Sequence, residues 1–314
     1  MKKELLLLLS LGLAACETLV NDVDPSRLPS SGGQLVVHGY LSPQDTVIQV
    51  SVSLSQKVLG QSPSNAFGSP SAISIPGATV TLTHENKSVN LAFKLNERFY
   101  TTAAQNIPIV AGQTYHLKVS YQGQTVTSSC TIPQAVPITE VRQDSVAAQG
   151  FMIGGTNPNL PKDRTYKIFW QDPAGQANFY RVEGYLVGKQ RVRQSNGQIK
   201  IQEFINFINF DWQRRRSNNL YSDDRLDGKT LSSSEGRLNY FLLTSNRNDY
   251  VAGTGQVNLL LISCDKAYYN YHRLLENYDD DNPFAEPTLL PSNIQGGLGC
   301  FAGYNQSRVL LPLR

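Results

Sequence analysis

Apolar and polar residues alternate strictly along much of the chain from residue 36 onward, and this alternation constrains the fold more than any other feature. Runs at residues 48–54, 78–83 and 115–121 place an apolar side chain at every second position. Successive side chains of a β-strand point to opposite faces, so these runs predict half-buried strands with one wet face. Similar runs lie near residues 36–40, 89–93, 99–102 and 125–132. We therefore predict an immunoglobulin-like β-sandwich over residues 34–136.

The second half of the chain predicts a β-rich, sandwich-like domain over residues 137–314, which begins after Pro133 and Pro137. Its expected strands cover residues 166–170, 179–187, 238–244, 257–263 and 298–304. The stretch between Gly188 and Gly236 shows no clear strand pattern, which fits either a functional excursion or hairpins that are hard to recognise. The predicted fold class is mostly β in both domains.

One short helix is expected at about residues 266–278 of the second domain. Asp265 is a good N-cap, and apolar positions recur at helical spacing at Tyr268, Tyr271, Leu275 and Tyr278. The helix runs into Asp279–Asp281, whose carboxylates lie at the negative end of the helix dipole. We expect turn amides and neighbouring arginines to compensate these charges and to fix the segment against the turn at residues 292–299, with bound calcium as the alternative.

The N-terminus has the three parts of a lipoprotein signal peptide. Two lysines and an apolar run fill residues 2–13, and Leu13-Ala14-Ala15-Cys16 is a small-residue cleavage site that ends on a thiol. The apolar run is far shorter than the roughly 18 to 20 residues that a membrane-spanning helix needs. We therefore predict a signal peptide at residues 1–15, lipidation of Cys16 and a lipidated tether at residues 16–33.

Charge and cysteine content narrow the classes of function. Removing residues 1–15 takes two lysines and one glutamate from 28 basic and 25 acidic side chains, which leaves 26 and 24, a balance near +2. This balance gives no electrostatic basis for binding nucleic acid. Cys130 falls on the apolar face of its predicted strand, so we expect a buried free thiol. Cys264 and Cys300 lie in or beside neighbouring elements and are candidates for a disulfide.

Several motifs together resemble the domain-of-unknown-function family 4249. The matching segments are LVVHGYLS, IPGATVTLT, AGQTYHLKVSYQGQTVTSSCTIP, SDDRLDGK, YYNYHRLL, NPFAEP and SNIQGGLGCFAGY. Cys300 departs from the pattern, because an aliphatic residue is more usual there. The resemblance implies an outer-membrane lipoprotein of Bacteroidota, anchored through N-terminal acyl chains and encoded beside TonB-dependent receptors, with no established activity. Glu17, Asp22 and Asp24 follow the lipidated cysteine and resemble a surface-export signal, so we favour the cell surface over the periplasmic face.

The sequence offers no motif for catalysis or for a resident metal. His38, His84, His116 and His272 are dispersed and have no second ligand at metal spacing. There is no nucleophile elbow or phosphate-binding loop, and we interpret Gly296-Gly297-x-Gly299 as a turn into the last strand. We predict no catalytic residue, no metal and no cofactor.

Two acidic clusters are the candidates for a calcium site, although neither has EF-hand spacing. One contains Asp223, Asp224 and Asp227, and the other contains Asp279, Asp281 and Glu286. Both loops offer the oxygen ligands that calcium prefers. The favoured interpretation is structural, with aspartates that cap turns and pair with nearby arginines.

An aromatic and basic segment is the candidate surface for a ligand or a partner. Its members are Phe204, Phe207, Phe210, Trp212, Arg214, Arg215 and Arg216. If they are exposed, they form a platform for sugars, peptides or a partner protein. Aromatic side chains are more often part of a core, and we favour that interpretation for these.

Two functional classes fit the sequence. The first is a non-enzymatic accessory lipoprotein that docks on a TonB-dependent outer-membrane transporter or captures its ligand. The alternative is a surface hydrolase of glycans or peptides, for which paired carboxylates about 5 to 10 Å apart would be needed in a glycosidase. The lack of a nucleophile or metal motif favours the first class.

Overall fold

A computed structural model describes residues 33–55, 74–146, 163–210, 219–238, 251, 253–276 and 290–313. Almost all of them belong to one compact unit, formed by Leu35–Leu54 and Ala72–Arg314. The predicted signal peptide, Cys16 and nearly all of the tether lie outside the described residues. No helix among the described residues is long and apolar enough to cross a membrane.

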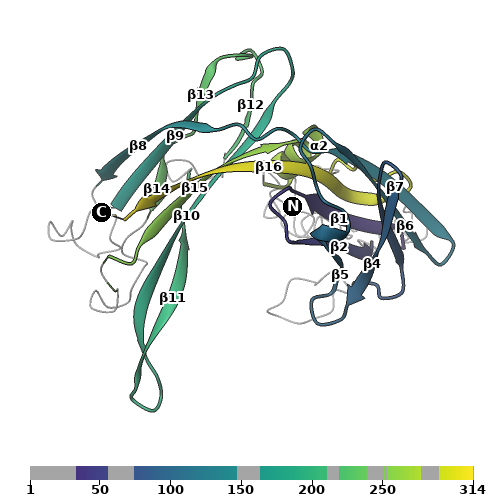
Figure 1. The fold of residues 1–314 in the computed structure, drawn as a ribbon, viewed down its shortest axis with the longest axis horizontal. Coiled ribbons are helices and arrows are strands. Elements are labelled where there is room, and N and C mark those ends of the chain that lie inside the picture. Colours follow the sequence, from purple (N-terminus) through teal and green to yellow (C-terminus); the bar gives the residue numbers. More distant parts are fainter. Residues whose placement is uncertain are drawn as a thin grey trace, which may run out of the picture. The chain divides into compact units, whose positions relative to one another are not determined.

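The described part of the chain is mostly β, which confirms the predicted class (Figure 1). Its strands are β1 (Leu35–Leu41), β2 (Val47–Leu54), β3 (Thr79–His84), β4 (Lys87–Lys94), β5 (Phe99–Ala103), β6 (Thr114–Tyr121), β7 (Gln124–Thr131), β8 (Ile138–Val146), β9 (Asp163–Gln171), β10 (Phe179–Arg193), β11 (Ile199–Phe207), β12 (Leu220–Ser222), β13 (Thr230–Ser232), β14 (Gly236–Leu238), β15 (Gln256–Cys264) and β16 (Leu298–Pro312). The helices are the 3-10 turn η2 (Ala104–Asn106) and α2 (Lys266–Glu276).

These strands form two sheets. The larger has twelve strands, with neighbours in the order β11-β10-β15-β16-β1-β2-β5-β4-β3-β6-β7 and β12 also paired with β10. The smaller has four strands, in which β8, β13 and β14 all pair with β9. The larger sheet therefore runs continuously from the first half of the sequence into the second.

Strands β1 to β7 form the sandwich-like region that the alternation predicts. β4 pairs with β3 along its first part and with β5 along its last residues, so it passes from one layer to the other. Val37 and Val52 from one layer share a core with Leu82 and Leu117 from the other. The alternating residues of each strand thus point inward and bury the core, as the period of two requires.

The C-terminal strand β16 also contributes to this first sandwich. Residues 298–303 pair in parallel with β1, and Phe301 is fully buried in the first core. Gly299 has φ +112°, and a Cβ atom there would lie 2.0 Å from the carbonyl oxygen of Val37, so the close approach of the two strands requires glycine. The glycine-rich segment leads into the last strand, as the sequence predicts, but that strand extends to Pro312.

The second core lies between the two sheets. Ile168 and Trp170 of β9 pack with Val182 of β10 and Leu259 of β15. The stretch between Gly188 and Gly236 holds the end of β10 and then β11, β12 and β13. The described residues of this stretch therefore form a hairpin and short strands, which fits the interpretation as hairpins that are hard to recognise.

Helix α2 begins as predicted, because a carboxylate oxygen of Asp265 accepts the backbone N–H of Tyr268 at 2.8 Å. Tyr268 and Tyr271 are buried against β16 and β1. The predicted apolar stripe is wrong at Leu275, which is exposed, while Tyr269 is buried instead. The buried face of the helix therefore includes Tyr269 in place of Leu275. Tyr278 and Asp279–Asp281 lie outside the described residues.

Three buried cysteines are free thiols. Cys130 is in the first core, which confirms its predicted placement, and Cys264 and Cys300 share a cluster beneath α2 without a disulfide between them. Burial raises the pKa of all three thiols, that of Cys300 to about 12. They are therefore protonated and unreactive at neutral pH.

Candidate functional site

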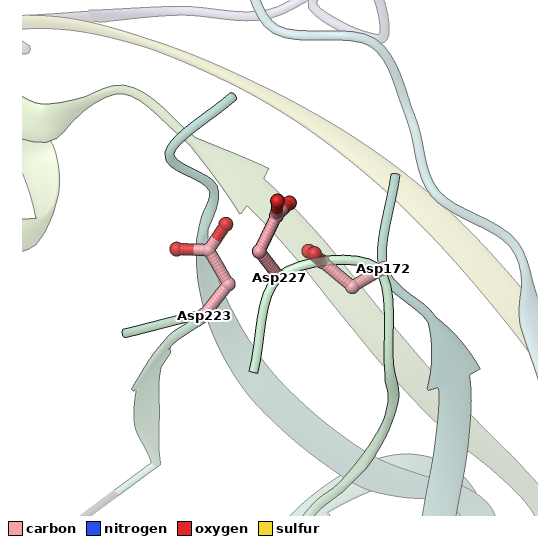
Figure 2. Close-up of side chains that lie close together, drawn as sticks. All are labelled: Asp172, Asp223 and Asp227. Atoms are coloured by element: carbon pink, nitrogen blue, oxygen red, sulfur yellow. The ribbon is translucent and has the colours of Figure 1, made fainter. Parts of the chain in front are cut away.

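Three carboxylates come together at one end of the second core. Asp172 follows β9, while Asp223 and Asp227 lie in the loop between β12 and β13 (Figure 2). One ligand oxygen from each lies within 4.8 Å of the others. The sequence places Asp223 and Asp227 in one cluster but gives no sign that Asp172 joins them, because the pairing of β9 with β13 brings it there across more than fifty residues.

Backbone amides of opposite loops bind these carboxylates. Asp172 accepts the N–H of Gly228 at 2.9 Å, Asp223 accepts that of Asn178 at 2.9 Å, and Asp227 accepts that of Gly175 at 2.9 Å. Each bond joins the β9–β10 loop to the β12–β13 loop. Charge-assisted bonds of this kind are about twice as strong as neutral ones, so the three aspartates hold the two loops together.

The turn that presents the cluster depends on left-handed backbone. Arg225 has φ +67° and Gly228 has φ +66°. A Cβ atom on Gly228 would lie 2.8 Å from the Cβ atom of Ala174, so the loops approach closely only with glycine at this position. The conformation of the loop therefore fixes where Asp227 points.

The cluster could hold one hard cation such as calcium, since it offers three carboxylates in one place. Asp172 is also bound to the hydroxyl of buried Tyr180 at 2.5 Å, and burial together with Asp172 raises the pKa of that phenol. Asp224 is exposed and accepts a bond from its neighbour Ser222. The other predicted calcium ligands, Asp279, Asp281 and Glu286, lie outside the described residues.

A cleft of about 480 Å³ lies beside the cluster. Asn178 and Tyr180 line it and bind Asp223 and Asp172 respectively. Asp265 lines it as well, and burial raises the pKa of this carboxyl to about 6 although the backbone N–H groups of Tyr268 and Gly303 oppose the shift. The role of Asp265 as helix cap accounts for its burial.

The structure separates the members of the predicted aromatic surface. Phe204 packs partly against the second core and Phe210 is buried in it, whereas Phe207 is 76% exposed. A spacing of three residues places neighbouring positions of a strand on opposite faces, so Phe204 and Phe207 cannot share a surface. Trp212 and Arg214–Arg216 lie outside the described residues.

A polar and aromatic layer beneath α2 is a feature that sequence patterns miss. His38 of β1 hydrogen-bonds the hydroxyl of Tyr271 at 2.8 Å, and the ring of His272 packs at a tilt against that of Tyr268 with ring centroids 4.2 Å apart. Burial lowers the pKa of both histidines, and nearby Arg181 and His38 lower that of His272 further, to about 4. Both imidazoles are therefore neutral at pH 7.

The family assignment rests on a match across nearly the whole chain. The sequence profile described as Domain of unknown function (DUF4249) matches residues 20–309. The chain belongs to the DUF4249 family. No curated protein matches it. The match covers both cores, the aspartate cluster and every described strand except the last residues of β16.

Proposed function

We propose that this DUF4249 chain is a non-enzymatic, lipid-anchored protein of the bacterial cell envelope that acts as an accessory or ligand-capture partner of a TonB-dependent outer-membrane transporter. The observation that carries the proposal is the Leu13-Ala14-Ala15-Cys16 signal, because a chain with this N-terminus is exported and then fixed to a membrane. The family resemblance supports the transporter as the partner and the outer membrane as the location.

Replacing the lipidated thiol tests the anchor. We expect Cys16→Ser to leave the precursor uncleaved or to release soluble protein, because no other residue can accept the acyl chains at this site. Detergent-phase partitioning of the wild type and the variant measures the difference. Equal partitioning would contradict the anchor, and protease treatment of intact cells separates a surface location from a periplasmic one.

Mild detergent extraction tests the transporter partner. We expect the wild-type protein to co-purify with a TonB-dependent receptor that is encoded beside it. Purification of the Cys16→Ser protein from the soluble fraction is the matched control. Recovery of the wild type without a receptor, under conditions that keep other receptor complexes intact, would contradict the partnership.

A surface hydrolase is the second candidate, and the carboxylate cluster beside the cleft is the observation that favours it. Retaining glycosidases need two carboxylates about 5 Å apart, and the oxygens of Asp172, Asp223 and Asp227 lie within 4.8 Å of one another. The backbone hydrogen bonds to all three place this candidate second. Release of reducing sugar from envelope glycans, and its loss in Asp172→Asn, would support the hydrolase.

A further inference from the structure

The hairpin β10–β11 extends beyond the larger sheet as a two-stranded ribbon. β10 pairs with β15 only as far as Val187, but its pairing with β11 continues to Arg193 (Figure 1). Val251 and Thr254 hydrogen-bond the backbone of Lys189 at the point where the ribbon leaves the sheet. No residue of β11 is buried, so the side chains of this strand bury little surface within the chain.

One face of the ribbon exposes a column of large apolar side chains along β11. The exposed fractions are 60% for Ile199, 58% for Ile201, 60% for Ile205 and 76% for Phe207. These residues occupy every second position except that of Glu203, so they share one face over about 26 Å at about 3.3 Å per residue. Glu203 interrupts the column between Ile201 and Ile205. Scattered apolar residues are normal on a protein surface, but four large exposed apolar side chains on one strand face indicate an interaction site.

A basic column lies beside the apolar one. The register of the hairpin places Arg193 opposite Ile199 and Lys189 opposite Glu203 on the same face. Between Tyr185 and Phe207 the hairpin has four basic residues and one acidic residue, a formal charge of +3, which equals that of the entire chain. Positive charge is therefore concentrated on this one hairpin.

The charge of the hairpin and the composition of its tip distinguish between the molecules that could bind this face. A second copy of the chain, docked face to face, would bring the basic columns together at a cost in repulsion. The tip, residues 194–198, is polar and uncharged, so the ribbon offers no apolar end for insertion into a lipid bilayer. The ribbon, with apolar and basic side chains in adjacent columns, instead suits the surface of another protein that is apolar and acidic.

We propose that the exposed face of β10–β11 docks on a partner protein that presents an apolar strip flanked by acidic side chains. This inference rests on the proposed function, because the partner is a protein of the same envelope. Burial of the Ile199–Phe207 column drives the association, and the basic column sets its orientation and rate.

Site-specific photocrosslinking in cells tests the proposal with the full-length chain. A benzoylphenylalanine probe replaces Ile201 or Phe207, and Leu95 is the matched control because it is also 76% exposed. We expect both hairpin probes to crosslink one and the same protein, identified by mass spectrometry through peptides that contain Asp or Glu beside apolar residues. The Leu95 probe should give no such adduct.

Charge reversal supplies the second measurement. Arg193→Glu combined with Lys189→Glu, both on the same face as Phe207, should reduce the adduct from Phe207 by about tenfold or more, while the melting temperature stays unchanged because both side chains are exposed. An unchanged adduct would overturn the acidic partner. Adducts with lipid or with a second copy of the chain would also overturn the inference. An adduct from Leu95 but not from the hairpin would refute this docking face and leave the proposed function standing, whereas no adduct from any position would count against both.

Discussion

The two terminal strands of the larger sheet, β7 and β11, differ in where their apolar residues point. β7 buries Val126, Ser128 and Cys130 and exposes the threonines and serines between them. β11 has no buried residue and exposes three isoleucines and a phenylalanine. Terminal strands of natural sheets usually present polar side chains to water, and β7 follows this rule while β11 does not. The chain itself covers the apolar face of β7. The apolar side chains of β11 have no such cover among the described residues and suit contact with another protein.

Truncation of one buried and one exposed phenylalanine of the larger sheet should give the largest contrast. Phe301 is fully buried in the same core as Val126, so Phe301→Ala should lower the free energy of unfolding by about 3–5 kcal/mol. Phe207→Ala should change it by less than about 0.5 kcal/mol. Urea unfolding of both variants measures the contrast. A cost for Phe207→Ala close to that for Phe301→Ala would mean that the chain itself covers the β11 face.

A change of one strand residue to threonine should give a smaller contrast. Val126→Thr places a hydroxyl in the first core, which should cost about 1–3 kcal/mol. Ile201→Thr leaves the hydroxyl in water and should have almost no effect, because threonine also suits a strand. Thermal unfolding of the two variants tests this pair, and a destabilised Ile201→Thr protein would contradict the exposed face.

The same two strands show how far the sequence predicts the fold. The alternation around Cys130 predicts both the strand β7 and its buried face, because polar and apolar residues follow the wet and dry sides. The segment that forms β11 shows no clear alternation, because Glu203 interrupts its apolar face and Phe204 precedes Ile205. Its large apolar residues also face water, so the sequence does not indicate which face is buried. Phe204 and Phe207, spaced by three, are candidates for one aromatic surface, but β11 places them on opposite faces.

Long-range pairing is the other part that the sequence could not predict. Local patterns identify residues 298–304 as a strand, but nothing local indicates that it pairs in parallel with β1 and completes the first core. Likewise the N-cap at Asp265 is readable from local spacing, whereas the meeting of Asp172 with Asp223 depends on which strands become neighbours. Contacts of high sequence separation are set by the whole fold.

Two titratable groups at α2, which packs on the middle of the sheet, should make moderate pH-dependent contributions to the stability of the fold. The pKa of His272 is lowered to about 4, so its contribution to stability is present above its ordinary value of 6.5 and is lost as the pH falls toward 4. Asp265 acts oppositely, since its pKa is raised to about 6 and its ionisation costs stability as the pH rises from about 4 to 6. The two effects offset each other in the wild type.

Removal of the histidine should therefore expose the effect of Asp265. We expect the melting temperature of His272→Phe to rise between pH 6.5 and pH 4.5 relative to that of the wild type over the same interval. Calorimetric scans across this range measure it, with His116→Phe on the exposed face of β6 as the control. A variant that follows the wild-type pH profile would contradict the buried, neutral state of His272.

The smallest effect is expected at the carboxylate cluster, which lies beside the first residues of β10. Asp227→Asn keeps an oxygen that can accept the N–H of Gly175 but removes one of three like charges, so it should raise the melting temperature slightly in the absence of metal. Asp224→Asn is the matched control, because this carboxylate is exposed and outside the cluster. Since backbone amides already bind all three carboxylates, calcium or a chelator should leave the wild-type melting temperature unchanged. A wild-type melting temperature that falls with chelator, while that of Asp227→Asn does not, would instead make the cluster a calcium site that stabilises the loops beside β10.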